Sequence, residues 1–155
     1  MNCLSFDVGG TTVKYGVIDE SYKILKKDKI PTPENENEFI KSLSNIIQEN
    51  LSNISKVSVA MPGYVNSANN KYLYGPHLQF DIDFSKLSNF TDYKFHLDND
   101  GNVAAYCEYF LNYKTKYSNL IMLTFGTGIG GGIISEGRLL RGRGNAGEIG
   151  HMLTS

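Results

Sequence analysis

Short apolar segments separated by glycine and proline dominate the first part of the chain. Two of them, residues 2–6 and 13–18, lie on either side of a Gly-Gly pair, which is typical of a β-hairpin. Residues 22–30 predict a third strand, which Pro31 and Pro33 end. The chain is therefore expected to begin with three successive strands.

The apolar spacing then changes from that of strands to that of a helix. Apolar residues recur at three- and four-residue intervals from Phe39 to Leu51, so an amphipathic helix that packs on a sheet is expected. Residues 57–61 form a short apolar run that ends at Pro62-Gly63 and predict a fourth strand. This order of elements indicates an α/β fold whose mixed sheet contains a helical crossover.

A helix is also expected near the middle of the second half. Residues 95–97 predict a brief strand, and residues 103–111 predict the helix that follows it. Either Asn99 or Asp100 would lie at the N-terminus of this helix, where a side-chain oxygen accepts hydrogen bonds from free backbone N–H groups.

The C-terminal strands repeat the arrangement seen at the N-terminus. Residues 120–125 form an apolar run that ends in a glycine loop, residues 126–132, and residues 133–134 continue it as a hairpin. The same order of strand, glycines and strand occurs near residues 4–18, which indicates a duplicated fold.

Composition and charge exclude several classes of partner. The 155 residues are 41% hydrophobic and 20% charged, as in an ordinary globular protein of one domain or of a domain and part of a second. Fifteen basic and 16 acidic residues give a net charge of −1, which predicts no nucleic-acid partner. No apolar run approaches the roughly 18 residues of a membrane span, so we expect no membrane partner and a cytoplasmic location.

The first glycine turn carries candidate phosphate-binding groups. Gly9 and Gly10 have no side chain to block the approach of a ligand to the backbone N–H groups, and Thr11 and Thr12 add hydroxyl donors. Asp7, at the end of the preceding strand, could hold Mg²⁺. The alternative is a simple tight turn, because Gly-Gly hairpins are common.

The second glycine loop gives a stronger signal. Five of the seven residues in 126–132 are glycine. A turn with only a structural role rarely has so many, because each glycine loses conformational entropy on folding. Close approach of a ligand to this backbone is the favoured interpretation.

Two further pairs could carry chemistry. Asp100 could be a general base for a hydroxyl nucleophile, although a helix cap is the simpler interpretation of Asn99-Asp100. Glu148 and His151, three residues apart, could both face one pocket and bind neighbouring sugar hydroxyls, or they could form only a loop salt pair.

These segments together resemble the ROK family, named for repressors, open reading frames and kinases, within the hexokinase–actin–heat-shock superfamily. Residues 7–11 resemble its first phosphate motif, residues 99–105 its catalytic segment, and residues 126–132 with 144–151 its signature. The resemblance implies a ribonuclease-H-like (actin-like ATPase) α/β domain with a mixed sheet. It also implies a second domain of similar kind, of which this chain holds the first strands.

The resemblance also implies roles for individual residues. Asp100 takes the position of the general base. The residues implied to line a hexose pocket are Gly63, Asn99, Glu148 and His151. The residues implied to lie near the phosphates of ATP and Mg²⁺ are Asp7, Gly10, Thr11, Thr127 and Gly128.

Zinc is not expected in this chain alone. In the family, a cysteine cluster follows the position of His151 and joins it in holding a structural zinc. The sequence ends four residues after His151 and contains none of those cysteines. One histidine cannot make a tetrahedral site, so His151 would be a zinc ligand only if a longer chain supplied the cluster.

The expected organisation is an N-terminal domain, residues 1–115, and the truncated start of a second domain, residues 116–155. The strands of the second part would lack covering helices and would expose an apolar surface for association. Because family members are often dimers, the resemblance also implies a homodimer.

The predicted function is ATP-dependent phosphorylation of a hexose-type sugar, namely glucose, an N-acetylhexosamine or a glucoside. The alternative is a non-catalytic sugar-binding or sensing module, since ROK repressors use the same scaffold. Those repressors carry a winged helix before the first glycine motif, for which residues 1–6 leave no room. A structural relative of actin or heat-shock proteins is disfavoured, because the segment 147–151 does not belong to those proteins.

Overall fold

The computed structural model describes residues 2–87, 93–126, 128–144 and 146–151. The chain forms two compact units, Met1–Asp98 and Asn99–Ser155. The helix predicted at residues 103–111 groups with the C-terminal strands, because its contacts are mainly with them. The expected division into domains at residue 115 stays a prediction.

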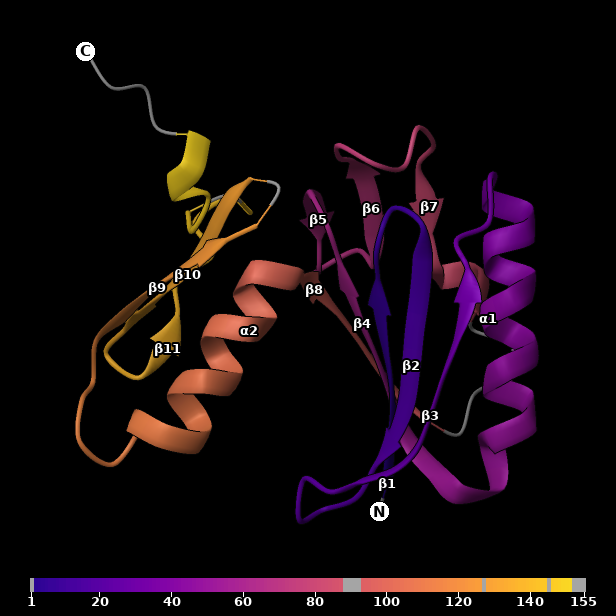
Figure 1. Ribbon diagram of the computed structural model, residues 1–155, viewed down its shortest axis with the longest axis horizontal. Helices are drawn as coiled ribbons and strands as arrows, with labels where there is room; N and C mark the ends of the chain where they lie inside the picture. The colour runs from indigo at the N-terminus through magenta and orange to yellow at the C-terminus, as the bar shows by residue number, and fades with distance from the viewer. Residues whose placement is uncertain (1, 88–92, 127, 145, 152–155) are drawn as a thin grey trace. The chain divides into compact units, whose positions relative to one another are not determined.

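The N-terminal unit is built on a five-stranded mixed sheet in the order β3-β2-β1-β4-β8 (Figure 1). The strands are β1 (Asn2–Val8), β2 (Thr12–Ile18), β3 (Ile24–Pro31), β4 (Ile54–Met61) and β8 (Lys94–Asn99). Strands β1, β2 and β3 are antiparallel neighbours, whereas β4 runs parallel to β1. The mixed sheet and its helical crossover, predicted from the order of apolar segments, are confirmed.

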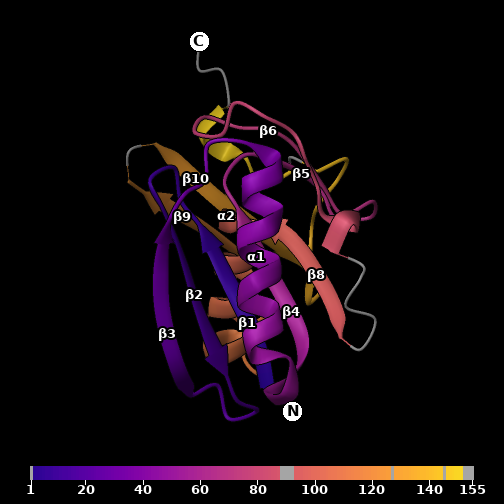
Figure 2. The ribbon, with the colours of Figure 1, turned by 90° about the vertical axis from the view of Figure 1, so that its right-hand side faces the viewer.

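One helix, α1 (Glu36–Asn50), lies across one face of this sheet (Figure 2). It begins where the Asn35 side chain accepts a hydrogen bond from the Glu38 N–H at 3.0 Å, an N-cap that satisfies one free donor. The alternate residues of β1 bury toward the same core. Buried residues that α1 and β1 contribute to this core include Phe39, Leu43, Ile47, Leu4, Phe6 and Val8.

A smaller sheet completes the N-terminal unit. It contains β5 (Tyr64–Asn66), β6 (Lys71–Tyr74) and β7 (Ile82–Asp83), followed by the short helix η2 (Phe84–Leu87). Another short helix, η1 (Leu51–Asn53), follows α1. Residues 64–87 are rich in Asn, Tyr and Gly, a composition that predicts loops and short strands without fixing their bounds.

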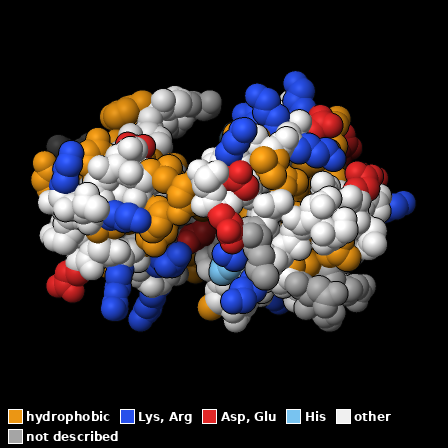
Figure 3. All heavy atoms as spheres, turned by 90° about the horizontal axis from the view of Figure 1, so that it is seen from below, with side chains coloured by type: hydrophobic (Ala, Val, Ile, Leu, Met, Phe, Trp, Pro, Cys, Tyr) orange, Lys and Arg blue, Asp and Glu red, His pale blue; other side chains and the backbone are white. Residues whose placement is uncertain are grey.

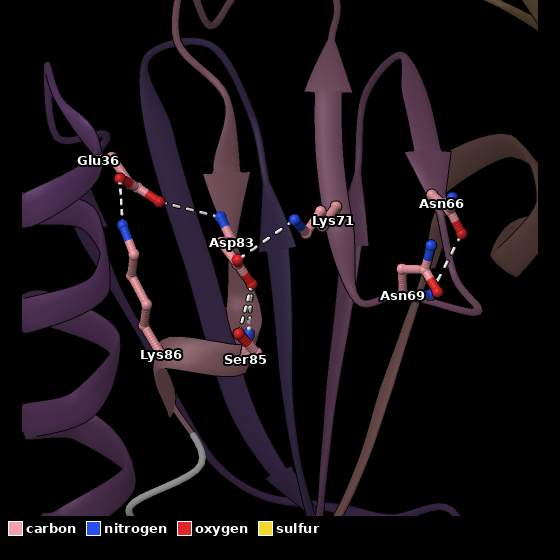
Figure 4. Close-up of polar contacts among 7 residues, drawn as sticks. All are labelled: Glu36, Asn66, Asn69, Lys71, Asp83, Ser85 and Lys86. Carbon is pink, nitrogen blue, oxygen red and sulfur yellow. Dashed lines mark hydrogen bonds and ion pairs between the residues drawn. The ribbon is translucent and has the colours of Figure 1, made fainter.

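Polar contacts tie the small sheet to the first turn of α1 (Figure 4). The Glu36 carboxylate accepts a hydrogen bond from the Asp83 N–H at 3.0 Å and pairs with the Lys86 ammonium. These two contacts lower the pKa of Glu36, the Lys86 contact being the larger cause. The Asp83 carboxylate in turn accepts from Ser85 and lies 3.5 Å from the Lys71 nitrogen.

The described part of the C-terminal unit contains an α-helix, two short helical segments and a three-stranded sheet. Helix α2 (Asp100–Glu108) continues into the π-helical turn η3 (Tyr109–Tyr113). The sheet has the order β11-β10-β9, with β9 (Leu120–Phe125), β10 (Ile129–Ser135) and β11 (Arg138–Leu139). The short helix η4 (Ile149–His151) follows.

This sheet is covered on one face and exposed on the other. Helix α2 packs on β10, so the expectation that these strands lack any covering helix is wrong for that face. Ile121, Leu123 and Phe125 alternate along β9 toward the other face and are 67%, 45% and 76% exposed. Exposed hydrophobic side chains are orange in the space-filling view (Figure 3). Nowhere in the described residues is a helix both long and apolar enough to cross a membrane.

Candidate functional site

The first glycine turn joins β1 to β2 in the N-terminal unit. The Gly9 N–H donates to the Thr12 carbonyl at 3.0 Å and closes the turn. Thr32, just after β3, adds two contacts: its hydroxyl donates to the Gly9 carbonyl at 2.6 Å, and its N–H donates to the Thr11 carbonyl at 3.0 Å. Thr32 therefore helps to fix the shape of the turn.

These contacts engage carbonyl groups and leave N–H groups available. Among the described residues, the N–H groups of Gly10 and Thr11 have no hydrogen-bond acceptor, and both residues are exposed. Adjacent unpaired N–H groups at a turn form a concave site that favours anions. The turn thus has the donor set that binding of phosphate oxygens requires.

Asp7 lies on β1, two residues before the turn. Its carboxylate is 63% exposed and lies 3.9 Å from the Lys14 ammonium of β2. One carboxylate fits Mg²⁺ when water and phosphate oxygens complete its coordination. Within the parts of the chain that the structure describes, no group of three His, Cys, Asp or Glu side chains could hold a metal ion. Asp7 could therefore contribute one ligand, and a bound phosphate would have to contribute others.

Gly63 follows β4 and has a structural reason to be glycine. Its φ of +92° lies in the region that other residues rarely adopt. A Cβ at this position would lie 2.6 Å from both the Gly75 Cα and the Tyr74 carbonyl oxygen. The backbone at Gly63 thus packs directly on the segment after β6. Its role in a hexose pocket stays a prediction.

The second glycine loop is shorter than the sequence predicts. Strand β10 already begins at Ile129, so the turn after β9 comprises residues 126–128. Gly126 and Gly128 have open space where a side chain would project, as the approach of a ligand would require. Thr127 lies outside the described residues.

The glycines inside β10 have a different explanation. A Cβ at Gly132 would lie 2.5 Å from the Cβ of Ala105 on α2 and 3.1 Å from the Gly101 carbonyl oxygen. Carbon atoms pack at about 3.5–4.0 Å, so only glycine allows this approach of helix and strand. The excess of glycine that indicated a ligand is thus partly a requirement of packing.

Asn99 and Asp100 have distinct positions at the start of α2. The buried Asn99 is the N-cap, and its side-chain oxygen accepts from the Asn102 N–H at 3.1 Å. Asp100 is the first helical residue and is exposed, with its Oδ1 accepting from the Gly101 N–H at 2.8 Å. Free N–H groups in the first turn of a helix stabilise a carboxylate anion. Asp100 is thus an exposed carboxylate at the end of the helix where a negative charge is favoured.

Glu148 links Asn99 with His151. Its Oε1 accepts from the Asn99 Nδ2 at 3.2 Å, and its Oε2 lies 3.4 Å from the His151 Nδ1. The Glu148 side chain is 25% exposed and the His151 side chain 81%. The structure thus gathers a carboxamide, a carboxylate and an imidazole, three groups that can bind neighbouring hydroxyls.

The predicted site residues fall into two sets. Residues 7–12 and Gly63 belong to the N-terminal unit, whereas Asn99, Asp100, Gly128, Glu148 and His151 belong to the C-terminal unit. Within the second set, Asn99, Glu148 and His151 form one cluster, and Asp100 is the neighbour of Asn99 in the chain.

Sequence reasoning missed two residues at the first turn. Thr32 stands between two prolines directly after a strand whose last residue pairs with Thr12, a position from which a hydroxyl can reach the turn. The side chain of His77 lies against Gly10, at a point where a methyl group on Gly10 would be 2.8 Å from the His77 Cβ. No local pattern indicates the second contact, because it depends on the path of the chain after β6.

Comparison with known proteins shows similarity over nearly the whole chain. A sequence model described as the ROK family matches residues 3–155. The N-acetylmannosamine kinase of Pasteurella multocida is 35% identical over 160 residues, which cover 99% of this chain and 53% of that protein. The β-glucoside kinase of Listeria monocytogenes is 32% identical over 159 residues, which cover 99% and 54%.

The fold is likewise similar to solved structures. The crystal structure of a ROK family glucokinase from Streptomyces griseus, in complex with glucose and AMPPNP, is 29% identical and has a TM-score of 0.84. The similarity covers 100% of this chain and 51% of that protein. The chain thus spans about half the length of the proteins that it matches.

Proposed function

The chain belongs to the ROK family, and on this premise we propose that the protein transfers a phosphoryl group from ATP to a hydroxyl of a hexose-type sugar. Glucose, N-acetylhexosamines and glucosides form the substrate class, as the names of the relatives indicate. The match over residues 3–155 confirms the family resemblance seen in the sequence motifs. The observation that carries the proposal is the Asn99–Glu148–His151 cluster at the start of the helix that Asp100 opens.

The cluster provides the polarity that a sugar requires. A carboxylate has about four lone-pair sites, so Glu148 can accept from sugar hydroxyls while it keeps its contacts to Asn99 and His151. The His151 imidazole, which is largely exposed, can donate or accept. Because Asn99 is buried and also caps α2, it holds Glu148 in a fixed place. These groups would orient the sugar.

Asp100 is the proposed general base. It would accept the proton of the sugar hydroxyl as that oxygen attacks the γ-phosphorus of ATP, and ADP would leave. Its exposure at the first turn of α2 supports access of a hydroxyl, and the hydrogen bond from Gly101 orients one of its oxygens. Phosphoryl transfer requires mostly positioning and charge neutralisation, so one carboxylate is sufficient as the base.

The glycine turns are the proposed nucleotide-binding elements. The N–H groups of Gly10 and Thr11, with the Thr11 and Thr12 hydroxyls, would donate to phosphate oxygens. The family resemblance implies that Thr127 and Gly128 also bind the nucleotide. Asp7 would hold Mg²⁺ directly or through water. When bound, Mg²⁺ neutralises charge on the phosphates.

Location and assembly complete the proposal. A cytoplasmic location would give the protein access to ATP, and fractionation of cells that express it would test this. A homodimer is expected from the family resemblance, and sedimentation of the purified chain would test that.

A sugar panel in a thermal-shift assay, with and without ATP–Mg²⁺, tests the proposed substrate class. A ligand that binds only the folded state stabilises by about 2.7 kcal/mol at a concentration of 100 times Kd, so even weak binding raises the melting temperature. We expect Glu148→Gln to lose the shift caused by a hexose. The control His96→Gln, an exposed residue of β8, should keep it.

Asp100→Asn tests the proposed base. We expect it to retain the sugar-dependent shift and to lose hexose phosphorylation by roughly 10²–10⁴-fold. Asp81→Asn, which removes an exposed charge elsewhere, is the matched control. Full phosphorylation activity in Asp100→Asn would refute the assignment of the base, and the absence of any shift across the panel would refute the substrate class.

A further inference from the structure

His77 lies against the first glycine turn and has no role in the function proposed above. A methyl group built on Gly10 would lie 2.8 Å from the Cβ and Cγ of His77 and 3.1 Å from its Nδ1. The φ of Gly10 is not in the left-handed region that favours glycine. The glycine at this position is therefore explained by the closeness of the imidazole rather than by the shape of the turn.

The segment that carries His77 is anchored on both sides. Gly75 packs on the preceding turn, where a Cβ on Gly75 would lie 3.1 Å from the Gly63 Cα. Leu78 is buried, and its carbonyl accepts from the buried Tyr72 hydroxyl at 3.4 Å. The backbone between these anchors sets the position of the His77 Cβ. The backbone therefore positions the exposed His77 side chain next to the turn.

The ring nitrogens of His77 are available to a ligand. In the part of the chain that the structure describes, no hydrogen bond or ion pair involves this imidazole. Among the residues described, the neighbouring N–H groups of Gly10 and Thr11 also have no acceptor, whereas the carbonyls of Gly9, Thr11 and Thr12 already accept hydrogen bonds. Donors thus gather at this place while three of the turn's carbonyl groups are engaged, an arrangement that suits an oxyanion.

We propose that His77 is a phosphate-binding residue whose imidazole donates a hydrogen bond to a phosphate oxygen held at the turn of residues 9–12. The ligand is a phosphate ester or anhydride, and it could be the polyphosphate of a nucleotide or the phosphate group of a phosphorylated sugar. The inference rests on the proposed function to the extent that the turn is taken as a phosphate site. The His77 imidazole would add a side-chain donor to the backbone N–H donors of the turn, and the segment that carries His77 also contacts Gly63.

The test uses three variants of the 155-residue chain. His77→Leu keeps the Cβ that packs near Gly10 and removes the ring donors, whereas His77→Gln keeps an N–H donor on a side chain of similar reach. His96→Leu removes another exposed histidine, on β8, and serves as the control. Thermal melting should show all three folded with melting temperatures close to the parent.

Binding is measured by NMR titration of the ¹⁵N-labelled chain with inorganic tripolyphosphate and, separately, with glucose 6-phosphate. The amide signals of Gly10 and Thr11 report the turn, and the imidazole signals of the three histidines report the ring. We expect the Gly10, Thr11 and His77 signals to shift together. His77→Leu should weaken binding by roughly 5–10-fold, the usual loss for one hydrogen bond, and His77→Gln should recover most of it.

The outcomes separate this inference from the proposed function. Stronger binding of tripolyphosphate assigns the site to a nucleotide, and stronger binding of glucose 6-phosphate assigns it to a sugar phosphate; either supports the proposal when His77→Leu weakens it. If Gly10 and Thr11 shift but His77→Leu binds like the parent, the role of His77 is overturned and the kinase proposal stands. If neither probe shifts the turn, the phosphate site itself is refuted, and the role of His77 with it.

Discussion

Replacement of Gly132 by alanine should destabilise the C-terminal unit, because the new methyl group has no room. Its Cβ would lie 2.5 Å from the Cβ of Ala105, which is fully buried, and 3.1 Å from the Gly101 carbonyl oxygen. Contact at about 3.5 Å or more requires α2 and β10 to separate by about 1 Å. Overpacking of this kind costs about 1–3 kcal/mol, which exceeds the 0.4–1 kcal/mol that glycine-to-alanine changes gain through the unfolded state.

Gly126→Ala is the matched control on the same hairpin. A Cβ there would have no atom within 4 Å, and its φ is not left-handed, so we expect a neutral or slightly stabilising effect. The two substitutions are chemically identical, but only Gly132→Ala should lower stability. Because the chain forms two compact units, unfolding need not be two-state. Hydrogen exchange of the α2 and β10 amides therefore measures the relevant opening free energy.

A double-mutant cycle tests whether the contact with Ala105 causes the destabilisation by Gly132→Ala. Ala105→Gly alone should destabilise by about 1 kcal/mol through helix propensity. Combined with Gly132→Ala it removes the opposing methyl group, so the double variant should be more stable than the sum of the single changes by about 1 kcal/mol. The reasoning fails if Gly132→Ala and Gly126→Ala have equal stability, or if the effects of the paired changes simply add.

Three further predictions follow from other contacts. The Lys86 contact and the Asp83 N–H lower the pKa of Glu36 in the folded protein. The contribution of Glu36 to the free energy of unfolding is therefore complete above the ordinary glutamate pKa of about 4.3, and it is lost as the pH falls through the folded pKa. Glu36→Gln should thus lose about 0.5–1 kcal/mol at pH 7 in urea unfolding, and this loss should shrink as the pH is lowered below about 4.3, whereas Glu38→Gln changes little. A loss that stays the same as the pH falls would contradict the assignment. Asn99→Ala removes the cap of α2, so it should destabilise the helix by about 1 kcal/mol, and it should also abolish the hexose-induced thermal shift. The control Asn99→Asp keeps the cap. A hexose-induced shift that is retained in Asn99→Ala would argue against a place for Asn99 in the sugar site. The chain should self-associate through the exposed face of β9, which is an edge strand of its described sheet. The double variant Ile121→Thr/Phe125→Thr should shift the sedimentation equilibrium toward the monomer. A parent chain that stays monomeric at high concentration would contradict this.

Local periodicity was sufficient to predict most elements. Apolar spacing from Phe39 to Leu51 placed α1 with an error of a few residues at its start, because the Asn35 cap begins the helix before the first apolar residue. The hairpin around Gly9-Gly10 and strands β4 and β9 also follow from the sequence, since alternation and turn residues act over short distances. For β5 to β7 the sequence predicts only loops and short strands without bounds or partners, because their pairing depends on contacts with one another rather than on pattern.

For the candidate site, the sequence identified residue types but could not assign them partners. It left open whether Asn99 or Asp100 caps α2, and the structure decides for Asn99, whose side-chain oxygen accepts from the Asn102 N–H. It proposed that Glu148 and His151 face one pocket, and the structure adds that Asn99 holds the Glu148 carboxylate. It could not separate the open glycine at 126 from the packed glycine at 132.

The sequence by itself thus determined most of the elements, the turn at Gly9-Gly10 and the family motifs, because these depend on residues that are close together in the chain. The tertiary structure alone decided which glycine packs on Ala105, that Thr32 holds the first turn, and that His77 lies beside Gly10. Such contacts join segments that are distant in sequence. Their existence depends on how the strands pair and where the chain returns, which no local pattern of residues encodes.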